Sequence, residues 1–238
     1  MKAIYMNFSQ MLRQMKQDVM LSIIALVPFL AGAAFRFIIP VAEGLITDYF
    51  GASAIIAPYY ELIDLFLIIL TPSMLNYVVA MVILEEADDH MAAYLAVTPL
   101  GKTGYLLSRL GVTGLITFPV SIFVAVLFHL STMDILTTTG IALAGTFQGV
   151  AVALLIVALS TNKVEGMAVG KMATLFSIGA FAPYFISGKA QYYLLFLPSF
   201  WMAKAIQPGN YSMLIISISL AVLWMVFLSA KFMRKIAG

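Results

Sequence analysis

Six long apolar stretches dominate the sequence, and each of them contains a single charged residue. A helix needs about 20 predominantly apolar residues to cross the hydrocarbon core of a bilayer, and each stretch reaches that length. Most of the charged residues lie outside the stretches. We therefore predict an all-α membrane protein that folds as a bundle of six transmembrane helices. With approximate ends, the predicted spans cover residues 19–39, 62–84, 104–130, 134–159, 166–187 and 211–233.

The overall composition is that of a membrane protein. Hydrophobic residues make up 63% of the 238 residues and charged residues 10%, whereas soluble domains average about 25% charged residues. The mean hydropathy is +1.03, and the length fits one transmembrane domain over residues 1–238. A net charge of +2, spread along the chain, argues against nucleic-acid binding. The absence of Cys excludes a disulfide, a thiolate nucleophile and a Cys-based metal site.

The placement of Lys and Arg predicts the orientation of the bundle. Cytoplasmic segments of membrane proteins carry an excess of these residues. With the N-terminus inside, ten of the 13 Lys and Arg fall on the cytoplasmic side, and Arg36, Lys189 and Lys204 fall outside. Six spans then return the C-terminus to the cytoplasm. The first apolar run begins near Val19 without a small-residue cleavage site before it, so we expect no cleavable signal peptide.

Three segments are predicted to lie along the membrane rather than across it. Residues 2–17 form an amphipathic helix that is too polar to span, and it serves either as a plain anchor or as an elbow that passes force into the first span. The outer segments 40–61 and 188–210 are rich in aromatic and apolar residues, so we expect them to lie in the interface or to re-enter it. The apolar face of the N-terminal helix consists of Ile4, Phe8, Met11, Leu12 and Met15.

The loop after the second span carries the most information about function. Four acids and a His stand at its start, and a short helix is predicted to end at Thr98, because the residue before a proline is pushed out of helical geometry. A metal site is one interpretation, but consecutive acids point to different sides of a helix and rarely enclose an ion. A solvated acidic surface and a docking helix for a cytoplasmic partner are the others. Charge and periodicity do not separate these last two.

Three motifs resemble those of type-two ABC exporter permeases. The first is the acidic loop itself, which continues into Thr98-Pro99-Leu100 and Tyr105-Leu106-Leu107. The second is Asn-Lys-Val-Glu-Gly at 162–166, with Lys171, at the entry into the fifth span. The third is Leu-Pro-Ser-Phe-Trp-Met-Ala-Lys-Ala at 197–205, before the last span. With the amphipathic elbow and six spans, the resemblance covers the whole chain, and it depends on the order and spacing of the motifs.

The resemblance implies the membrane-spanning permease subunit of an ABC exporter in a bacterial cytoplasmic membrane. In this family the first cytoplasmic loop, here 85–97, forms a coupling helix that docks on a separate ATPase subunit. Permeases pair as a homodimer or a heterodimer, with the substrate path at their interface, and the ATPase binds ATP and Mg, so we expect no cofactor in this chain. The sequence departs from the family at Asp88-Asp89-His90, which leaves open which acid contacts the ATPase. The expected docking residues are Glu85, Glu86, Asp88, Asp89, Met91, Tyr94 and Leu95.

No catalytic, cofactor-binding or metal-binding set emerges from the sequence. Residues 96–103 nearly spell a nucleotide-binding P-loop, but Ala96 replaces the first Gly, Pro99 removes an N–H donor, and a helix precedes where a strand is needed. Neither a Ser/His/Asp set nor an HExxH motif is present. We therefore predict a transport subunit that is not itself an enzyme.

A candidate ionic cluster at the outer side supports the alternative function. Glu61 and Asp64 lie one turn apart at the outer end of the second span, and acids at such depth are costly and often functional. Pairing with Arg36 would give them a structural role. If they instead bind an ion or proton, the chain would be a stand-alone secondary transporter or channel. In the same region, Asp134 is placed to begin a helix.

Overall fold

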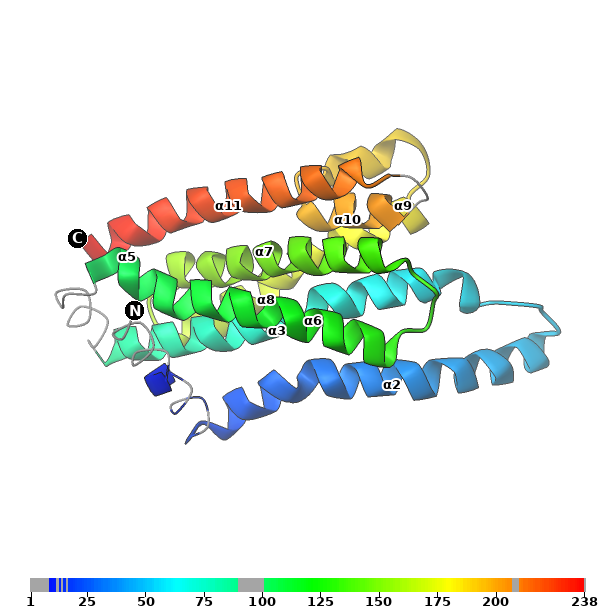
Figure 1. Ribbon diagram of the computed structural model, residues 1–238, viewed down its shortest axis with the longest axis horizontal. Helices are drawn as coiled ribbons and strands as arrows, with labels where there is room; N and C mark the ends of the chain where they lie inside the picture. Colours follow the sequence, from blue (N-terminus) through cyan, green and yellow to red (C-terminus); the bar gives the residue numbers. More distant parts are fainter. Residues whose placement is uncertain are drawn as a thin grey trace.

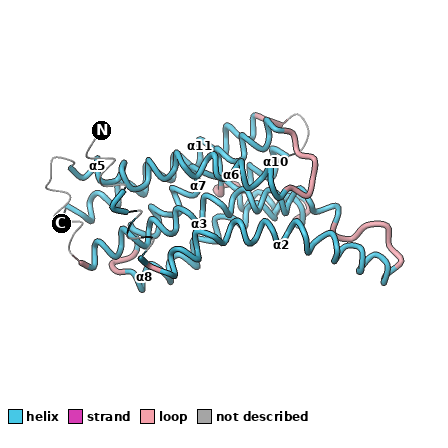
Figure 2. Tube along the Cα trace, turned by 60° about the horizontal axis from the view of Figure 1, so that its bottom comes forward, coloured by secondary structure: helices cyan, strands magenta, loops and turns pink. Residues whose placement is uncertain are grey.

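The computed structural model describes residues 9–11, 13, 15, 17–89, 101–206 and 210–237, and every regular element within these ranges is helical (Figure 1). Five of its helices are long and apolar enough to cross a membrane. They run roughly along one axis and pack side by side in both views (Figures 1 and 2). The chain is therefore a multi-pass membrane protein. These five segments are Val19–Phe50, Ala57–Asp88, Gly104–Phe128, Ile135–Leu159 and Ser212–Lys235.

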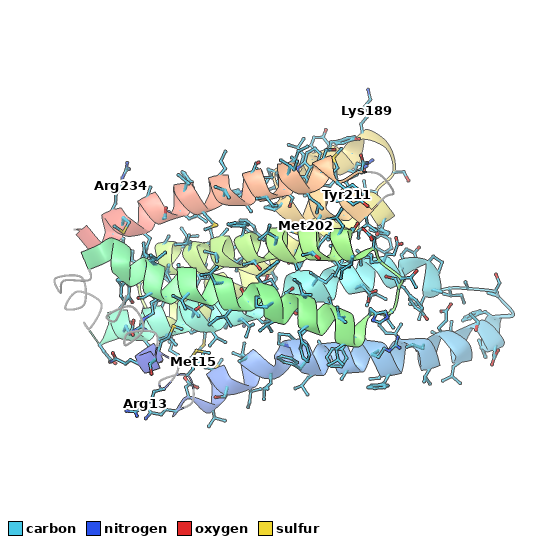
Figure 3. All side chains as sticks on the ribbon, in the orientation of Figure 1. Arg13, Met15, Lys189, Met202, Tyr211 and Arg234 are labelled. Carbon is cyan, nitrogen blue, oxygen red and sulfur yellow. The ribbon has the colours of Figure 1, made fainter. Side chains whose placement is uncertain are left out.

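The bundle has two distinct ends. One end, called the terminal end below, holds the start of the first long helix and the end of the last, and Figure 3 places Arg13 and Arg234 there. The other, called the distal end, holds Lys189 and Tyr211 (Figure 3). Arg13 and Arg234, which were both predicted to be cytoplasmic, thus lie at the same end.

Helix α2 (Val19–Phe50) extends eleven residues beyond its predicted end. Asp18 caps its start by accepting a hydrogen bond from the Leu21 N–H, and Pro40 lies inside the helix without ending it. The 32 residues give a length of about 48 Å at 1.5 Å per residue, more than a bilayer core requires. The helix ends at Gly51, whose φ of 63° is the left-handed conformation that glycine adopts without strain.

The outer segment 40–61 therefore begins as an extension of α2 to Phe50, and its interfacial or re-entrant position stays a prediction. The Glu43 carboxylate accepts hydrogen bonds from the N–H groups of Ile55, Ile56 and Ala57 at 2.9, 2.7 and 3.3 Å. These bonds fold the chain back against α2. The short helix η1 (Ala57–Tyr59) then leads into the next long helix.

Helices α3 (Tyr60–Asp88) and α7 (Ile135–Leu159) form the centre of the bundle. In the most apolar 18-residue stretch of each helix, 72% of the residues are buried in α3 and 83% in α7. The corresponding shares are 11% in α2 and 22% in α11 (Ser212–Ala237). A Gly-x-x-x-Gly pair in α7 permits their close approach. A Cβ on Gly149 would lie 2.8 Å from the Pro72 carbonyl of α3. The start of α7 confirms the prediction, because Asp134 accepts the N–H of Leu136.

The predicted third span is a composite of three helical segments, two of them α-helical and one a π-helix. It consists of α5 (Gly101–Leu106), the π-helix η2 (Leu107–Gly111) and α6 (Val112–Phe128). Helix α6 also compensates for the proline in α3. Pro72 has no N–H for the carbonyl of Ile68, and the Ser121 hydroxyl of α6 donates to that carbonyl at 2.9 Å.

The predicted fifth span is helical from Gly166 to Phe185 but divided. Helix α8 (Lys163–Ala173), the 3₁₀-helix η3 (Thr174–Phe181) and α9 (Ala182–Phe185) follow one another directly. None of the three alone reaches the length of a spanning helix, which is why five long helices stand where six were predicted. The eight-residue 3₁₀ run exceeds the usual three or four.

The outer segment 188–210 contributes to the packing of the distal end. After η4 (Gly188–Leu194), α10 (Pro198–Ile206) is largely buried. The Ser199 hydroxyl donates to the Phe176 carbonyl of η3 at 2.5 Å, and the Ser217 hydroxyl of α11 donates to the Pro198 carbonyl at 2.9 Å. The structure thus packs this helix between η3 and α11, and its interfacial or re-entrant position stays a prediction.

The predicted N-terminal helix falls partly within the described residues, which are helical at 9–11, 13, 15 and 17. Met11 is 1% exposed and Met15 packs against the core of the terminal end. Arg13 faces outward. The apolar face thus contacts the bundle itself. Ile4, Phe8 and Leu12 lie outside the described residues.

Candidate functional site

The four acids of the predicted docking segment lie on the last turn of α3 and just after it, at the terminal end. Helix α3 continues to Asp88, so Glu85 and Glu86 are helical rather than part of a loop. Successive helical residues point about 100° apart. The four carboxylates therefore have different surroundings, and only part of the set is exposed.

Glu86 points into the bundle, where it forms an ion pair with Arg109. Glu86 is 1% exposed and Arg109 is fully buried. The guanidinium donates from Nη2 to Oε1 and, at 3.2 Å, from Nε to Oε2. The Tyr105 hydroxyl donates to Oε2 at 2.7 Å, and its ring lies 5.8 Å from the guanidinium carbon. This two-point geometry fixes the relative orientation of the two side chains. We call Glu86, Tyr105 and Arg109 the buried triad.

The buried triad lies at the π-helix η2. In this segment the Val112 N–H donates to the Leu107 carbonyl five residues earlier, and π-turns inside helices are frequent at functional sites. Neighbouring hydroxyl groups bind carbonyls around it: Ser108 donates to Tyr105 at 2.8 Å, and Thr113 donates to Arg109 at 2.6 Å. The irregular turn is thus supported by side-chain hydrogen bonds.

Glu85 points the other way, toward the start of α8. Its carboxylate lies 2.9 Å from the Lys163 ammonium, which is also 2.9 Å from Asp18 before α2. The hydrogen bond from Lys163 holds the pKa of Asp18 below its usual range. Burial lowers the pKa of Lys163, but its bonds to Asp18 and Glu85 outweigh this effect and raise the pKa above its ordinary value. We call these three residues the terminal clamp.

Asp88 and Asp89 are exposed at the end of α3. Asp88 accepts the backbone N–H of Lys163 at 3.0 Å, where the positive end of the α8 dipole favours a carboxylate. The start of α8 is itself capped, because Asn162 accepts the Glu165 N–H at 2.8 Å and Glu165 accepts the Thr161 N–H at 2.6 Å.

The described structure therefore divides the predicted docking set. Glu85, Asp88 and Asp89 present carboxylates at the terminal end, whereas Glu86 is enclosed and cannot reach a partner surface. Met91, Tyr94 and Leu95 lie outside the described residues. His90, which the metal interpretation needs, lies outside them as well.

The predicted outer ionic cluster takes a different form. Among the described residues, no ion pair joins Arg36 to Glu61 or Asp64, which differs from the predicted pairing. Arg36 donates to the His129 carbonyl at 2.7 Å, and Glu61 is exposed. Asp64 is 4% exposed and accepts the N–H groups of Leu130 and Ser131. Arg36 of α2 and Asp64 of α3 thus bind backbone groups of the same turn, at residues 129–131, because this turn passes between the two helices.

The Ser131 hydroxyl also donates to Asp64, at 2.6 Å. Beside it lies a cavity of about 190 Å³, lined by Asp64, His129 and Thr138 among others.

A second cavity, of about 380 Å³, lies between α6, α7 and α11. Its lining, which includes Gly114, Phe118 and Phe147, has no charged side chain, so it is suited to apolar groups.

Sequence reasoning missed the inward role of Glu86 and the importance of Tyr105 and Arg109. One signal was available: Arg109 is the single charged residue of its span, and such a residue is expected to face the bundle interior and to have a partner. Its partner could not be named from the sequence, because Glu85 and Glu86 are adjacent and equivalent until their helix is placed.

A protein-family model described as fluoroquinolones export permease protein Rv2686c-like matches residues 11–230. The match spans nearly the whole chain and includes the buried triad and the terminal clamp. A search of curated proteins found no sequence similar to this chain. The family match agrees with the resemblance to exporter permeases that the sequence motifs carry.

Proposed function

Because the chain belongs to the Rv2686c-like family of fluoroquinolone export permeases, we propose that it is the membrane-spanning subunit of an ABC exporter. In this function, ATP hydrolysis by a separate ATPase subunit drives substrate outward, and ATP and Mg are bound by that partner. The observation that carries the proposal is the exposed acidic edge at the terminal end, at Asp88 and Asp89. Directly behind this edge lies the buried triad, which can receive force from a docked partner.

The proposed topology has six crossings, with residues 166–185 as the fifth. Helices α7 and α11 run in the same direction (Figure 1), so the chain must return between them from the terminal to the distal end. Lys163 lies at the terminal end beside Asp18, and Tyr211 contacts Asp134 at the distal end at 3.3 Å. The intervening helices α8, η3 and α9 have a combined length of roughly 38 Å by their standard rises, which is enough to cross the hydrocarbon core.

The proposed orientation places the terminal end in the cytoplasm of a bacterium. The excess of Lys and Arg at this end supports the assignment, and it puts the docking residues on the side where an ATPase has access to ATP. For docking we retain Glu85, Asp88 and Asp89 together with Met91, Tyr94 and Leu95. We omit Glu86, because a buried carboxylate bound to a guanidinium is not available to a partner. A homodimer or a heterodimer with a related permease would supply the second half of the exporter.

The proposed cargo is a class of amphiphilic aromatic molecules, of which the fluoroquinolones in the family description are an example.

The stand-alone transporter has less support, because the Asp64 oxygens are engaged by Leu130 and Ser131. A structural role accounts for this acid without an ion.

The decisive experiment is a mild-detergent pull-down of the tagged chain from its native host, followed by mass spectrometry. We expect an ATPase with a P-loop to co-purify in stoichiometric amount. The variant Asp88→Lys/Asp89→Lys should lose it while the chain still inserts. The matched control is Asp48→Lys, which reverses an acid at the distal end. Recovery of the chain without an ATPase, under conditions that keep another ABC complex intact, would refute the proposal.

A further inference from the structure

The buried triad bridges the two ends of the predicted coupling segment. Helix α3 ends at Asp88, and α5 begins at Gly101. Glu86 stands two positions before the end of α3, and Tyr105 stands four positions after the start of α5. The ion pair between Glu86 and Arg109 therefore closes the segment at its base, across 23 positions of sequence.

Stability alone does not account for such a pair. Removing two charges from water costs several kcal/mol per ion, and replacing a buried ion pair by apolar residues is often neutral or stabilising. An Arg–carboxylate pair with two hydrogen bonds instead fixes orientation, whereas apolar side chains of similar size can slide past one another. The triad therefore supplies geometry that apolar packing at this position would not.

The helix beyond the triad is built differently. The π-turn η2 contains Arg109 and ends at Gly111, and Gly114 and Pro119 follow within α6. Helix bends are found at π-bulges and prolines. The segment just before α6, which contains Arg109, is thus fixed to α3. The turns that follow it carry the features that permit a bend.

We infer that Glu86, Tyr105 and Arg109 are positioning residues that make the terminal end of α3 and the α5–η2 segment before α6 move as one body when a docked partner pushes on the chain between α3 and α5. The inference rests on the proposed function. A push at the segment moves both helix ends together, and α6 then tilts about the π-turn. Without the triad, the same push separates or twists the two ends, and ATP hydrolysis is no longer converted into outward movement of cargo.

The test uses an apolar triad, Glu86→Leu/Tyr105→Phe/Arg109→Met, which removes the two buried charges and the Tyr105 hydroxyl together. In the complex with its ATPase, we expect a melting temperature equal to or above that of the wild type. Transport of a fluorescent fluoroquinolone into inside-out vesicles, per ATP hydrolysed, should fall about fivefold or more. Transport at the wild-type ratio would overturn the inference and leave the triad a structural role only.

A second variant covers the case in which the apolar triad fails to fold. Arg109→Lys keeps the charge but loses the two-point geometry, and its transport per ATP hydrolysed should also fall. A normal ratio for this variant would overturn the inference as well. The matched control is Lys235→Met, which removes a cation at the same end that donates to the Val157 and Ser160 carbonyls at the end of α7. An equal fall in this control would show a general loosening of the terminal end and refute the specific role.

A direct distance measurement does not depend on the cargo. The chain has no native Cys, so spin labels can be placed at Ala87→Cys and Leu107→Cys alone. In the wild-type background the distance should stay unchanged when ATP and vanadate are added to the complex, and with the apolar triad it should broaden or shift. Equal distributions in both backgrounds would refute the rigid connection. Failure of the wild-type chain to bind any ATPase would instead refute the proposed function, and the two failures are thereby distinguished.

Discussion

The ammonium of Lys163 lies 2.9 Å from the carboxylate of Asp18, which joins the first residue of α8 to the residue that caps α2. The two positions are 145 residues apart in sequence. Lys163 also reaches Glu85 at the end of α3, so one side chain links three helices at the terminal end. Its 22% exposure leaves it in contact with water, and the link should respond to pH.

The terminal clamp is expected to be intact between about pH 5 and about pH 10. The pKa of Asp18 is lowered in the folded protein, so its contribution is present above the ordinary value of 3.8 and lost as the pH falls through the folded value. The pKa of Lys163 is raised, so its contribution is present below 10.5 and lost as the pH rises through the folded value. Asp18→Asn should lower the free energy of unfolding by about 1 kcal/mol or less, as for other partly exposed pairs.

Thermal unfolding of the wild type and Asp18→Asn in detergent, followed across this pH range, measures the effect. The difference between the two should be constant from about pH 5 to about pH 10 and should shrink below about pH 4. A difference that already disappears near pH 6 would contradict the assignment of the effect to this carboxylate.

The contact between α3 and α7 predicts a strong effect of one added methyl group. In Gly149→Ala the new Cβ would lie 2.8 Å from the carbonyl carbon and oxygen of Pro72, and backbone atoms cannot move aside without shifting the helix. We expect a loss of about 1–3 kcal/mol in stability, as for other overpacked cores. Gly44→Ala in α2 is the control, because its Cβ would meet no atom within 4 Å. Equal stability of the two variants, measured by unfolding in detergent, would refute the close contact.

The turn at the distal end predicts different roles for its two acids. Asp64→Asn replaces an acceptor of the Leu130 and Ser131 N–H groups by an amide that must place one donor nearby, and we expect a loss of about 1–3 kcal/mol. Glu61→Gln should have little effect, since Glu61 is exposed. Melting temperatures of the two variants give the comparison. If Asp64→Asn instead has normal stability but abolishes a transport activity that proceeds without ATP, the result would favour the stand-alone transporter.

Much of the fold follows from the sequence because a backbone in lipid must satisfy its own hydrogen bonds, and a long apolar segment does so by forming a helix. The apolar runs predicted the approximate positions of the spanning helices, and Asp134 marked a helix start. Helix ends were less well predicted at Pro40 and Asp88. A proline removes only one backbone hydrogen bond, and acidic residues can form the last turn of a helix. Helices α2 and α3 therefore extend beyond their apolar runs.

The site was predictable in place but not in detail. The acids at 85–89 lie at one end of the bundle, as the charge pattern indicated, and Glu85, Asp88 and Asp89 reach its surface or a neighbouring helix. The predicted pairing of Arg36 with Glu61 or Asp64 was not found, because backbone groups of the intervening turn bind Arg36 and Asp64 instead. A sequence pattern records which charges are near the membrane boundary, but not which backbone groups will compete for them.

The sequence by itself determined that this protein is a helical bundle in a membrane, because apolar length and the placement of charge are local properties of the chain. Only the tertiary structure decided that Glu85 binds Lys163 while its neighbour Glu86 is buried against Arg109. Two adjacent helical residues differ by about 100° in direction, and which of them faces inward depends on how α3 is rotated within the bundle. That rotation is set by packing against helices far away in sequence, such as the approach of Pro72 to Gly149.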